Sequence, residues 1–142
     1  AVEGAIEQGV GYLTLYAFST ENWKRPVTEV CDLMGLLRLY LRQEIKKLHD
    51  ENIKLRVIGS RAELDPDIVK LIENAEHLTK DNDLLTVVIA LNYGSRDEIL
   101  DATRAIARAV LEGRESLDTI DDTRFEAALS TYNIPDPDLI IR

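Results

Sequence analysis

Several residue types that characterise particular classes of protein are scarce or absent in this chain. There is one cysteine, Cys31, among 142 residues, which excludes an internal disulfide and a zinc site built from cysteines. Free cysteine behaves as a small hydrophobe, so Cys31 is expected to be buried, and nothing indicates an oxidising compartment. No apolar run reaches the roughly 18 residues that a membrane-spanning helix needs, and no signal peptide is visible.

Basic residues are also few. Lysine and arginine total 17 against 26 aspartate and glutamate residues, a formal net charge of −9. Nucleic-acid binding needs a basic face to meet the phosphates, so no nucleic-acid partner is expected. An anion site in this chain has to be local and built from a few arginines. The two histidines, His49 and His77, have no cluster of Cys, Asp or Glu at metal-ligand spacing, so both are expected on solvated helix surfaces and no metal ligand is assigned.

The remaining composition is that of a globular protein, with 45% hydrophobic and 30% charged residues. Apolar spacing predicts helices that alternate with strands. The predicted strands are residues 11–18, 54–58, 84–91 and 138–141, and the predicted helices are residues 4–8, 27–51, 66–79, 95–111 and 121–130. This order predicts an α/β fold with a mainly parallel central sheet flanked by helices. The apolar run at 84–91 is typical of a strand buried on both faces.

Capping residues mark several of the helix boundaries. Thr28 is expected to cap the long second helix, and Asp65 followed by Pro66 fits the N-cap and first position of the third. Ser95 and Glu98 have capping-box spacing, which predicts a helix start at that point.

Ligands of parallel sheets bind beyond the carboxyl ends of the strands. That rule selects three places, which are the segment Ser19–Pro26, the turn Asn92–Arg96, and Arg142. The turn could form an anion cradle, but a capped helix with Arg96 in its first turn is the favoured alternative. Arg142 follows an apolar predicted strand, which makes it a phosphate candidate.

The first of these segments concentrates polar chemistry. Arg25 can bind a phosphate through two parallel hydrogen bonds, and the hydroxyls of Ser19 and Thr20 can donate to it. Asn22 can donate and accept at once, and Trp23 offers an apolar surface with one N–H donor. This set suits a ligand that is part phosphate and part hydrocarbon. The alternative is a polar surface loop with the indole folded onto the core.

The stretch Val30–Leu41 (VCDLMGLLRLYL) is unusually apolar for a helix. Only Asp32, Gly35 and Arg38 interrupt the run, and their spacing places them on one narrow stripe. Such a helix is not an ordinary surface helix. It is expected to be buried, to line an apolar cavity or to pack on another subunit.

Residues Leu13–Pro26 (LTLYAFSTENWKRP) resemble the signature of the cis-prenyltransferase family, whose bacterial members are undecaprenyl diphosphate synthases. Three further segments resemble the family in the expected order: Ile58–Gly59 after a strand, Asn92–Arg96 (NYGSR, against NYGGR in the family), and Pro135–Arg142 (PDPDLIIR). The resemblance covers essentially the whole chain, and the FSTENW block is highly specific.

This resemblance implies a fold like that of undecaprenyl diphosphate synthase and a prenyltransferase activity. The family condenses isopentenyl diphosphate onto an allylic diphosphate such as farnesyl diphosphate with the help of Mg²⁺, which yields a long-chain polyprenyl diphosphate, the lipid carrier for cell-wall synthesis. The resemblance also implies a homodimer in the cytoplasm, with peripheral contact at the inner membrane face through the lipid product.

The resemblance also implies roles for individual residues. Asn22 matches the asparagine proposed to assist proton removal and is the catalytic candidate. The implied substrate-binding residues are Ser19, Thr20, Glu21, Trp23, Arg25 and Arg142. The implied residues of the hydrophobic tunnel for the growing chain are Ala17, Leu33, Leu36, Leu37 and Leu85.

The departures from the family pattern matter as well. The family's DGNGRW motif, with its catalytic aspartate, is expected before Ala1 and a further glutamate after Arg142, so the Mg²⁺ ligands are expected outside residues 1–142. We therefore expect one cis-prenyltransferase domain truncated at both ends, inactive by itself. Ser60 and Ser95 replace an Asp and a Gly common in the family. Two alternatives stay open: a non-catalytic partner subunit of the same fold, and a lipid-phosphate binding module. Retention of the polar signature residues favours the enzyme.

Overall fold

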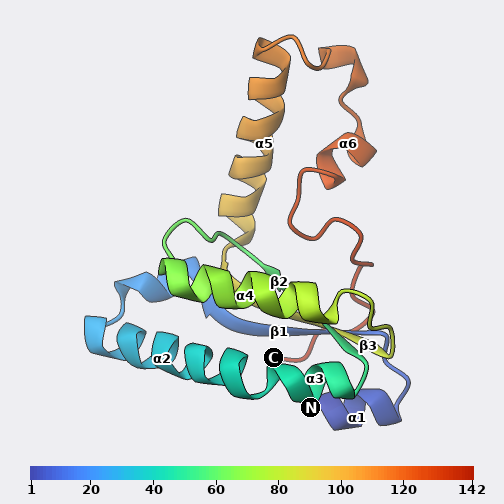
Figure 1. Cartoon of the computed structure of the whole chain (residues 1–142). Coiled ribbons are helices and arrows are strands. Elements are labelled where there is room, and N and C mark those ends of the chain that lie inside the picture. Colours follow the sequence, from blue (N-terminus) through green and yellow to red (C-terminus); the bar gives the residue numbers. More distant parts are fainter. The chain divides into compact units, whose positions relative to one another are not determined.

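The computed structural model describes all of residues 1–142 (Figure 1). The chain falls into two compact units, Ala1–Gly94 and Ser95–Arg142, which are described one after the other. That the two units make up a single domain stays a prediction from the sequence.

The first unit alternates helices and strands. Its elements are α1 (Val2–Glu7), β1 (Tyr12–Ser19), the 3₁₀ helix η1 (Thr20–Lys24), α2 (Val27–Gln43), α3 (Ile45–Asp50), β2 (Ile53–Ile58), α4 (Pro66–Thr79) and β3 (Leu85–Tyr93). All three predicted strands of this region are present. The alternation confirms the α/β fold class.

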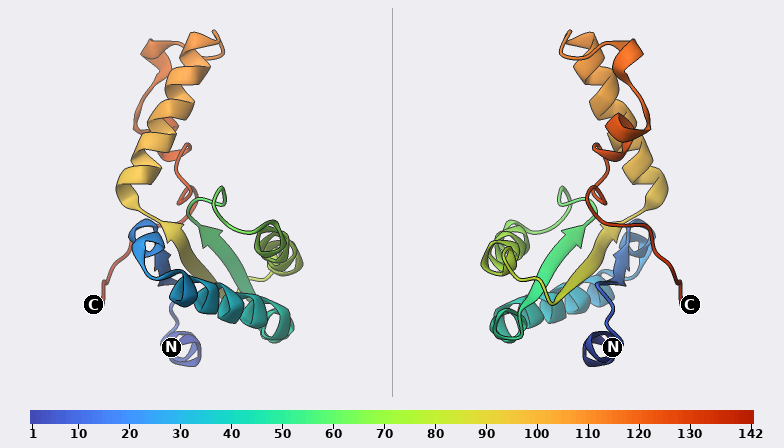
Figure 2. Two further views of the ribbon diagram at one scale, coloured as in Figure 1. Left: turned by 90° about the vertical axis from the view of Figure 1, so that its left-hand side faces the viewer. Right: turned by 90° about the vertical axis from the view of Figure 1, so that its right-hand side faces the viewer.

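The strands form one parallel sheet in the order β1-β3-β2. The arrows of β2 and β3 run in one direction in both views of Figure 2. Because β3 is the central strand, its residues are covered on both faces, and Val87, Val88 and Ala90 are all buried. The apolar run therefore has the cause that the sequence predicts. At the edge, β1 carries a bulge at Ala17, where the register with β3 shifts.

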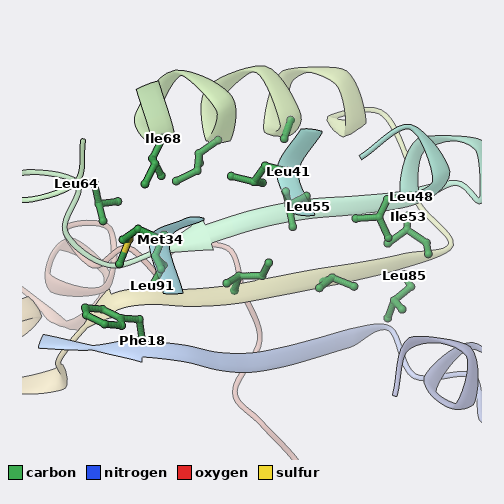
Figure 3. Close-up of a cluster of buried hydrophobic side chains, with 14 of the residues drawn as sticks. Phe18, Met34, Leu41, Leu48, Ile53, Leu55, Leu64, Ile68, Leu85 and Leu91 are labelled. Carbon is green, nitrogen blue, oxygen red and sulfur yellow. The ribbon is translucent and has the colours of Figure 1, made fainter. Parts of the chain in front are cut away.

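The main core lies between the sheet and helices α2, α3 and α4. Figure 3 shows Met34 and Leu41 of α2 and Ile68 of α4 directed at the side chains of Leu55 and Leu91 from the sheet. Burying such apolar side chains provides about 1.5–3 kcal/mol each, and this is the main driving force for helix docking.

The long predicted helix 27–51 is interrupted. It divides at Glu44 into α2 and α3, although no glycine or proline marks the break, and Leu41 and Leu48 are buried on either side of it. The prediction that Thr28 caps the helix is wrong. The helix begins one residue earlier, at Val27, with Pro26 in the N-cap position, so Thr28 lies inside the first turn.

The second unit contains α5 (Ser95–Leu111), the 3₁₀ helix η2 (Leu117–Thr119) and α6 (Asp122–Glu126). The predicted helix 95–111 is confirmed. None of the helices in the chain combines the length and the apolar character that crossing a bilayer requires.

Two predictions for this unit are wrong. The helix predicted to extend to Ser130 ends at Glu126, because the carboxylate of Glu98 accepts hydrogen bonds from the backbone N–H and the hydroxyl of Ser130. That N–H is no longer available to a helical carbonyl. The strand predicted at 138–141 is absent, because a strand needs a ladder partner and no other segment of the second unit is a strand.

Candidate functional site

The candidate site lies at the carboxyl ends of the three strands of the first unit. β1 continues directly into η1, β3 ends beyond Asn92, and β2 continues into the loop that begins with Gly59 and Ser60. In the parallel sheet these ends share one edge, so segments far apart in the sequence meet there.

The segment after β1 is a structured 3₁₀ helix rather than an irregular loop. Ser19 and Asn22 form a capping box, in which the Ser19 backbone N–H donates to Asn22 Oδ1 at 2.8 Å. The side-chain oxygen of Asn22, the catalytic candidate, therefore stabilises the turn that carries Trp23 and Arg25.

Trp23 is half-buried and held from two directions. Its ring lies edge-on to Phe18, with ring centroids 5.1 Å apart. Its indole Nε1–H donates to Asn92 Oδ1 at 2.7 Å. The indole packs against the core cluster, as the alternative interpretation of this segment predicts, and it also lines a pocket.

That pocket has a volume of about 330 Å³. It is lined by Trp23, Arg25, Val27, Val30, Cys31, Met34, Arg38, Glu63 and Asp65. The apolar part of the wall comes from one face of α2, and charged groups surround it. A pocket of this mixed character suits an amphipathic ligand with a charged end and an apolar end.

Arg25 is the more accessible of the two arginines in this wall. Its closest ion pair is a long contact of 3.9 Å with Glu29 one helical turn away, and both side chains are more than half exposed. Such exposed pairs contribute little stability, so Arg25 can turn to an incoming anion. Arg38, in contrast, donates to Asp65 and to Asp67 at the start of α4.

The prediction that Cys31 is buried is wrong. It is exposed and lies in the wall of the pocket, because the core-facing positions of α2 are Val30, Met34 and Leu41, and Cys31 is one position beyond Val30. The helix Val30–Leu41 is thus only partly buried: Leu36 and Leu39 of the same stretch are 64% and 50% exposed. His49 and His77 are exposed helix residues, as predicted.

Asn92 has a more central place in this site than the sequence predicts. It is 1% exposed and has a left-handed backbone, with φ of 49°. Besides accepting from Trp23, its amide Nδ2 donates to Ser60 O at 3.0 Å and to Glu63 Oε2 at 2.6 Å. The side chain is committed to the protein, which disfavours the anion-cradle interpretation of this turn. An asparagine at the end of a buried strand was the available signal.

Gly59 explains how the loop after β2 reaches this point. Its φ is +111°, and a Cβ placed there would lie 2.1 Å from the carbonyl oxygen of Leu91. Only glycine fits so close to the neighbouring strand. The next residue, Ser60, donates its backbone N–H to Asn92 O at 3.1 Å.

Tyr16 of β1 lies close to the same edge. Its hydroxyl donates to the Tyr93 carbonyl oxygen at 2.6 Å, and the two rings meet edge-on with centroids 5.9 Å apart. Partial burial, followed by the nearby Glu21 carboxylate, raises the pKa of Tyr16. A tyrosine is already protonated at neutral pH, and the raised pKa extends the alkaline range over which this hydroxyl keeps donating.

The other residues predicted for the site differ widely in their exposure to solvent. Ser19 and Thr20 are half-buried, and Glu21 is exposed. Among the predicted tunnel residues, Ala17 lies exposed at the β1 bulge, Leu33 and Leu36 are exposed on α2, Leu37 is half-buried, and Leu85 is buried in the sheet. Arg142 is exposed and belongs to the second unit. The roles assigned to these residues stay predictions.

The family resemblance implies Mg²⁺, an ion that proteins bind through carboxylate and other oxygen ligands. No group of three or more His, Cys, Asp or Glu side chains is placed to hold a metal ion. Both carboxylates of the pocket wall already accept hydrogen bonds within the protein. Asp65 accepts one from Arg38, and Glu63 accepts one from the Asn92 amide. The residues present therefore do not fit the ion.

The comparison with protein families decides which family this site belongs to. All of residues 1–142 match the prenyltransferase family described as undecaprenyl diphosphate synthase. The chain belongs to this family. The resemblance inferred from Leu13–Pro26 and the three later segments is thereby confirmed.

Prenyltransferases of several bacteria are close relatives in sequence. The chain is 54% identical over 141 residues to the isoprenyl transferase of Agrobacterium fabrum, covering 99% of this chain and 57% of that protein. It is 52% identical over 141 residues to the isoprenyl transferase of Brucella suis, covering 99% of this chain and 56% of the relative. The chain thus spans somewhat more than half the length of these relatives.

Solved structures of prenyl diphosphate synthases share the fold. Lavandulyl diphosphate synthase from Lavandula x intermedia, solved with dimethylallyl diphosphate, matches with a TM-score of 0.87 and 33% identity, over 94% of this chain and 57% of that one. A probable undecaprenyl diphosphate synthase from Campylobacter jejuni matches with a TM-score of 0.77 and 34% identity, over 91% and 60%. The chain therefore shares the fold of these two diphosphate synthases.

Proposed function

We propose that this chain is part of an enzyme that elongates cis-prenyl chains by condensing isopentenyl diphosphate onto an allylic diphosphate such as farnesyl diphosphate. The observation that carries the proposal is the pocket at the strand ends, where Trp23 and Arg25 meet an apolar wall of α2. Family membership and the relatives named isoprenyl transferase support it.

The chemistry makes clear demands on such a site. The allylic C–O bond breaks and releases diphosphate, the resulting carbocation is attacked by the alkene of isopentenyl diphosphate to form a C–C bond, and a proton is then lost. Guanidinium groups stabilise the departing diphosphate charge, and apolar surroundings keep water from the cation. Arg25 meets the first demand, and the α2 wall with the Trp23 indole meets the second.

The proposed roles of the other residues follow from the family motif. Ser19, Thr20 and Glu21 contact substrate together with Trp23 and Arg25, and Arg142 binds diphosphate. An amide is a weak base, so Asn22 positions the substrate while a diphosphate oxygen takes the proton. The growing chain lies along Ala17, Leu33, Leu36, Leu37 and Leu85.

Mg²⁺, a homodimer, a cytoplasmic setting and peripheral contact with the membrane through the lipid product belong to the same proposal. The described residues provide no ligand set for Mg²⁺, so the proposal assigns none of them to the ion.

The decisive experiment uses the full-length protein that contains these residues. It is incubated with labelled isopentenyl diphosphate, farnesyl diphosphate and Mg²⁺, and the extracted prenyl products are sized. A long polyprenyl product supports the proposal. A folded protein that binds diphosphate without forming product would instead favour the partner-subunit or lipid-phosphate binding alternatives.

A further inference from the structure

We propose that Asn92 is a positioning residue for prenyl diphosphate binding, because its side-chain amide holds two walls of the pocket in register without lining the pocket itself. The two walls are Trp23 and Glu63, which belong to η1 and to the loop between β2 and α4. The inference rests on the proposed function in so far as Trp23 contacts the substrate.

The hydrogen bonds leave the amide one orientation. Its oxygen faces the indole Nε1–H, a donor that cannot accept, and its nitrogen faces the Ser60 carbonyl and the Glu63 carboxylate, which cannot donate. A reversed amide would set N–H against N–H and oxygen against two oxygens. Both N–H groups and the oxygen are therefore used, and the side chain is almost fully buried.

This arrangement restrains the indole in a way that packing alone does not. The edge-on contact with Phe18 at 5.1 Å packs the Trp23 ring, but packing is less directional than a hydrogen bond and leaves some freedom to turn about the χ1 and χ2 bonds. The hydrogen bond from Nε1 to Asn92 at 2.7 Å removes that freedom. The same amide holds Glu63, so the spacing between the indole and this carboxylate across the pocket depends on one side chain.

The backbone narrows the choice of test variants. Asn92 has φ of 49°, a conformation that glycine adopts readily and alanine does not. Asn92→Gly therefore removes the amide with least backbone strain. Asn92→Asp keeps an acceptor for Trp23 but turns a second carboxylate oxygen toward Glu63.

A buried asparagine elsewhere provides a matched control. Asn82 is 6% exposed, and its amide Nδ2 donates to Ile53 O at 2.7 Å, at the amino end of β2. Asn82→Gly removes a buried amide hydrogen bond and destabilises the fold without contacting the candidate site.

The experiment measures the full-length protein with these variants by two readouts. The emission of Trp23 is isolated by subtracting the spectrum of the same protein carrying Trp23→Phe, and its quenching by acrylamide is recorded. Steady-state kinetics give KM for farnesyl diphosphate and kcat separately. We expect Asn92→Gly to shift Trp23 emission to the red, to increase quenching and to raise KM roughly tenfold with a smaller change in kcat, the loss of about one hydrogen bond.

The controls separate positioning from stability. Asn82→Gly should lower the melting temperature and leave Trp23 emission and KM unchanged. In the Trp23→Phe background, Asn92→Gly should raise KM by much less, because the link to the indole is already gone. An Asn92→Gly protein with wild-type emission and KM would overturn the inference, as would additive effects in the double variant.

The role of Asn92 can still be tested if a variant does not fold or if no product forms. Should Asn92→Gly fail to fold, Asn92→Asp decides, because repulsion from Glu63 displaces its acceptor oxygen from Trp23: a raised KM with red-shifted Trp23 emission supports the inference, and an unchanged KM or an unchanged emission overturns it. Should the wild-type protein form no prenyl product, the proposed function fails separately, and Trp23 emission with the affinity for inorganic pyrophosphate still tests Asn92.

Discussion

Arg38 on α2 and Asp67 in the first turn of α4 form a two-pronged ion pair, with Nε donating to Oδ2 at 2.7 Å and Nη2 donating to Oδ1 at 3.0 Å. Arg38 also donates to Asp65, the N-cap of the same helix. One guanidinium thus joins the helix that forms the apolar pocket wall to the start of the next helix.

This pair predicts a pH-dependent stability. The hydrogen bond from Arg38 lowers the pKa of Asp67 below its usual range. A lowered pKa in the folded state stabilises the protein above the unfolded pKa of about 4, and this contribution is lost as the pH falls through the folded value. Arg38→Gln should therefore lower the melting temperature at pH 7, and the difference from wild type should shrink below pH 4. Thermal melts across that range, with Arg104→Gln as the exposed-pair control, test it; a difference independent of pH would contradict it.

Substitution by alanine is expected to change the free energy of unfolding in opposite directions at Gly59 and at Gly35. Gly59→Ala places a Cβ 2.1 Å from Leu91 O at a φ of +111°, and should cost about 3 kcal/mol or more in the free energy of unfolding. Gly35 lies within α2 with no atom within 4 Å of its Cβ position, so Gly35→Ala should stabilise by about 0.5–1 kcal/mol. Urea unfolding of both variants measures the difference. Equal effects would show that the close approach of Gly59 to β3 is not strict.

The exposure of Cys31 predicts a reactive thiol in the native protein. A thiol reagent should modify Cys31 without denaturant, at a rate within roughly tenfold of that of the unfolded chain. Because Cys31 and Trp23 line the same pocket, a bulky aromatic label should also quench Trp23 emission. Cys31→Ser is the blank. Modification that requires denaturant would restore the burial that the sequence predicts.

Removing the charge of Arg25 is expected to reduce the affinity for diphosphate. Arg25→Gln should weaken pyrophosphate binding by roughly tenfold or more, since a charged hydrogen bond to phosphate contributes about 1.5–3 kcal/mol. Lys24→Gln changes the net charge equally one residue earlier, outside the pocket wall, and should have a small effect. Titration calorimetry of both variants measures the contrast. Equal losses would assign the binding to general charge instead of the Arg25 side chain.

The sequence by itself determined the fold class, the parallel character of the sheet and the start of α4 at Asp65–Pro66. These follow from local causes: apolar runs bury, and a proline after a capping residue begins a helix. The location of the candidate site after β1 follows as well, because ligands of parallel sheets bind at the carboxyl ends of the strands, whereas the 3₁₀ helix η1 at that place was not predicted. The motif of Leu13–Pro26 pointed to the family for the same region.

Only the tertiary structure decided the rest. Cys31 is exposed, the segment 138–141 is not a strand, and the helix after Asp121 is short, because each outcome depends on which partner lies across the fold. Asn92 is the clearest case. Its type and position at a strand end are visible in the sequence, but its three hydrogen bonds join residues up to 69 positions apart. Contacts of that range exist only once the strands have aligned, since the sheet alone brings their carboxyl ends together.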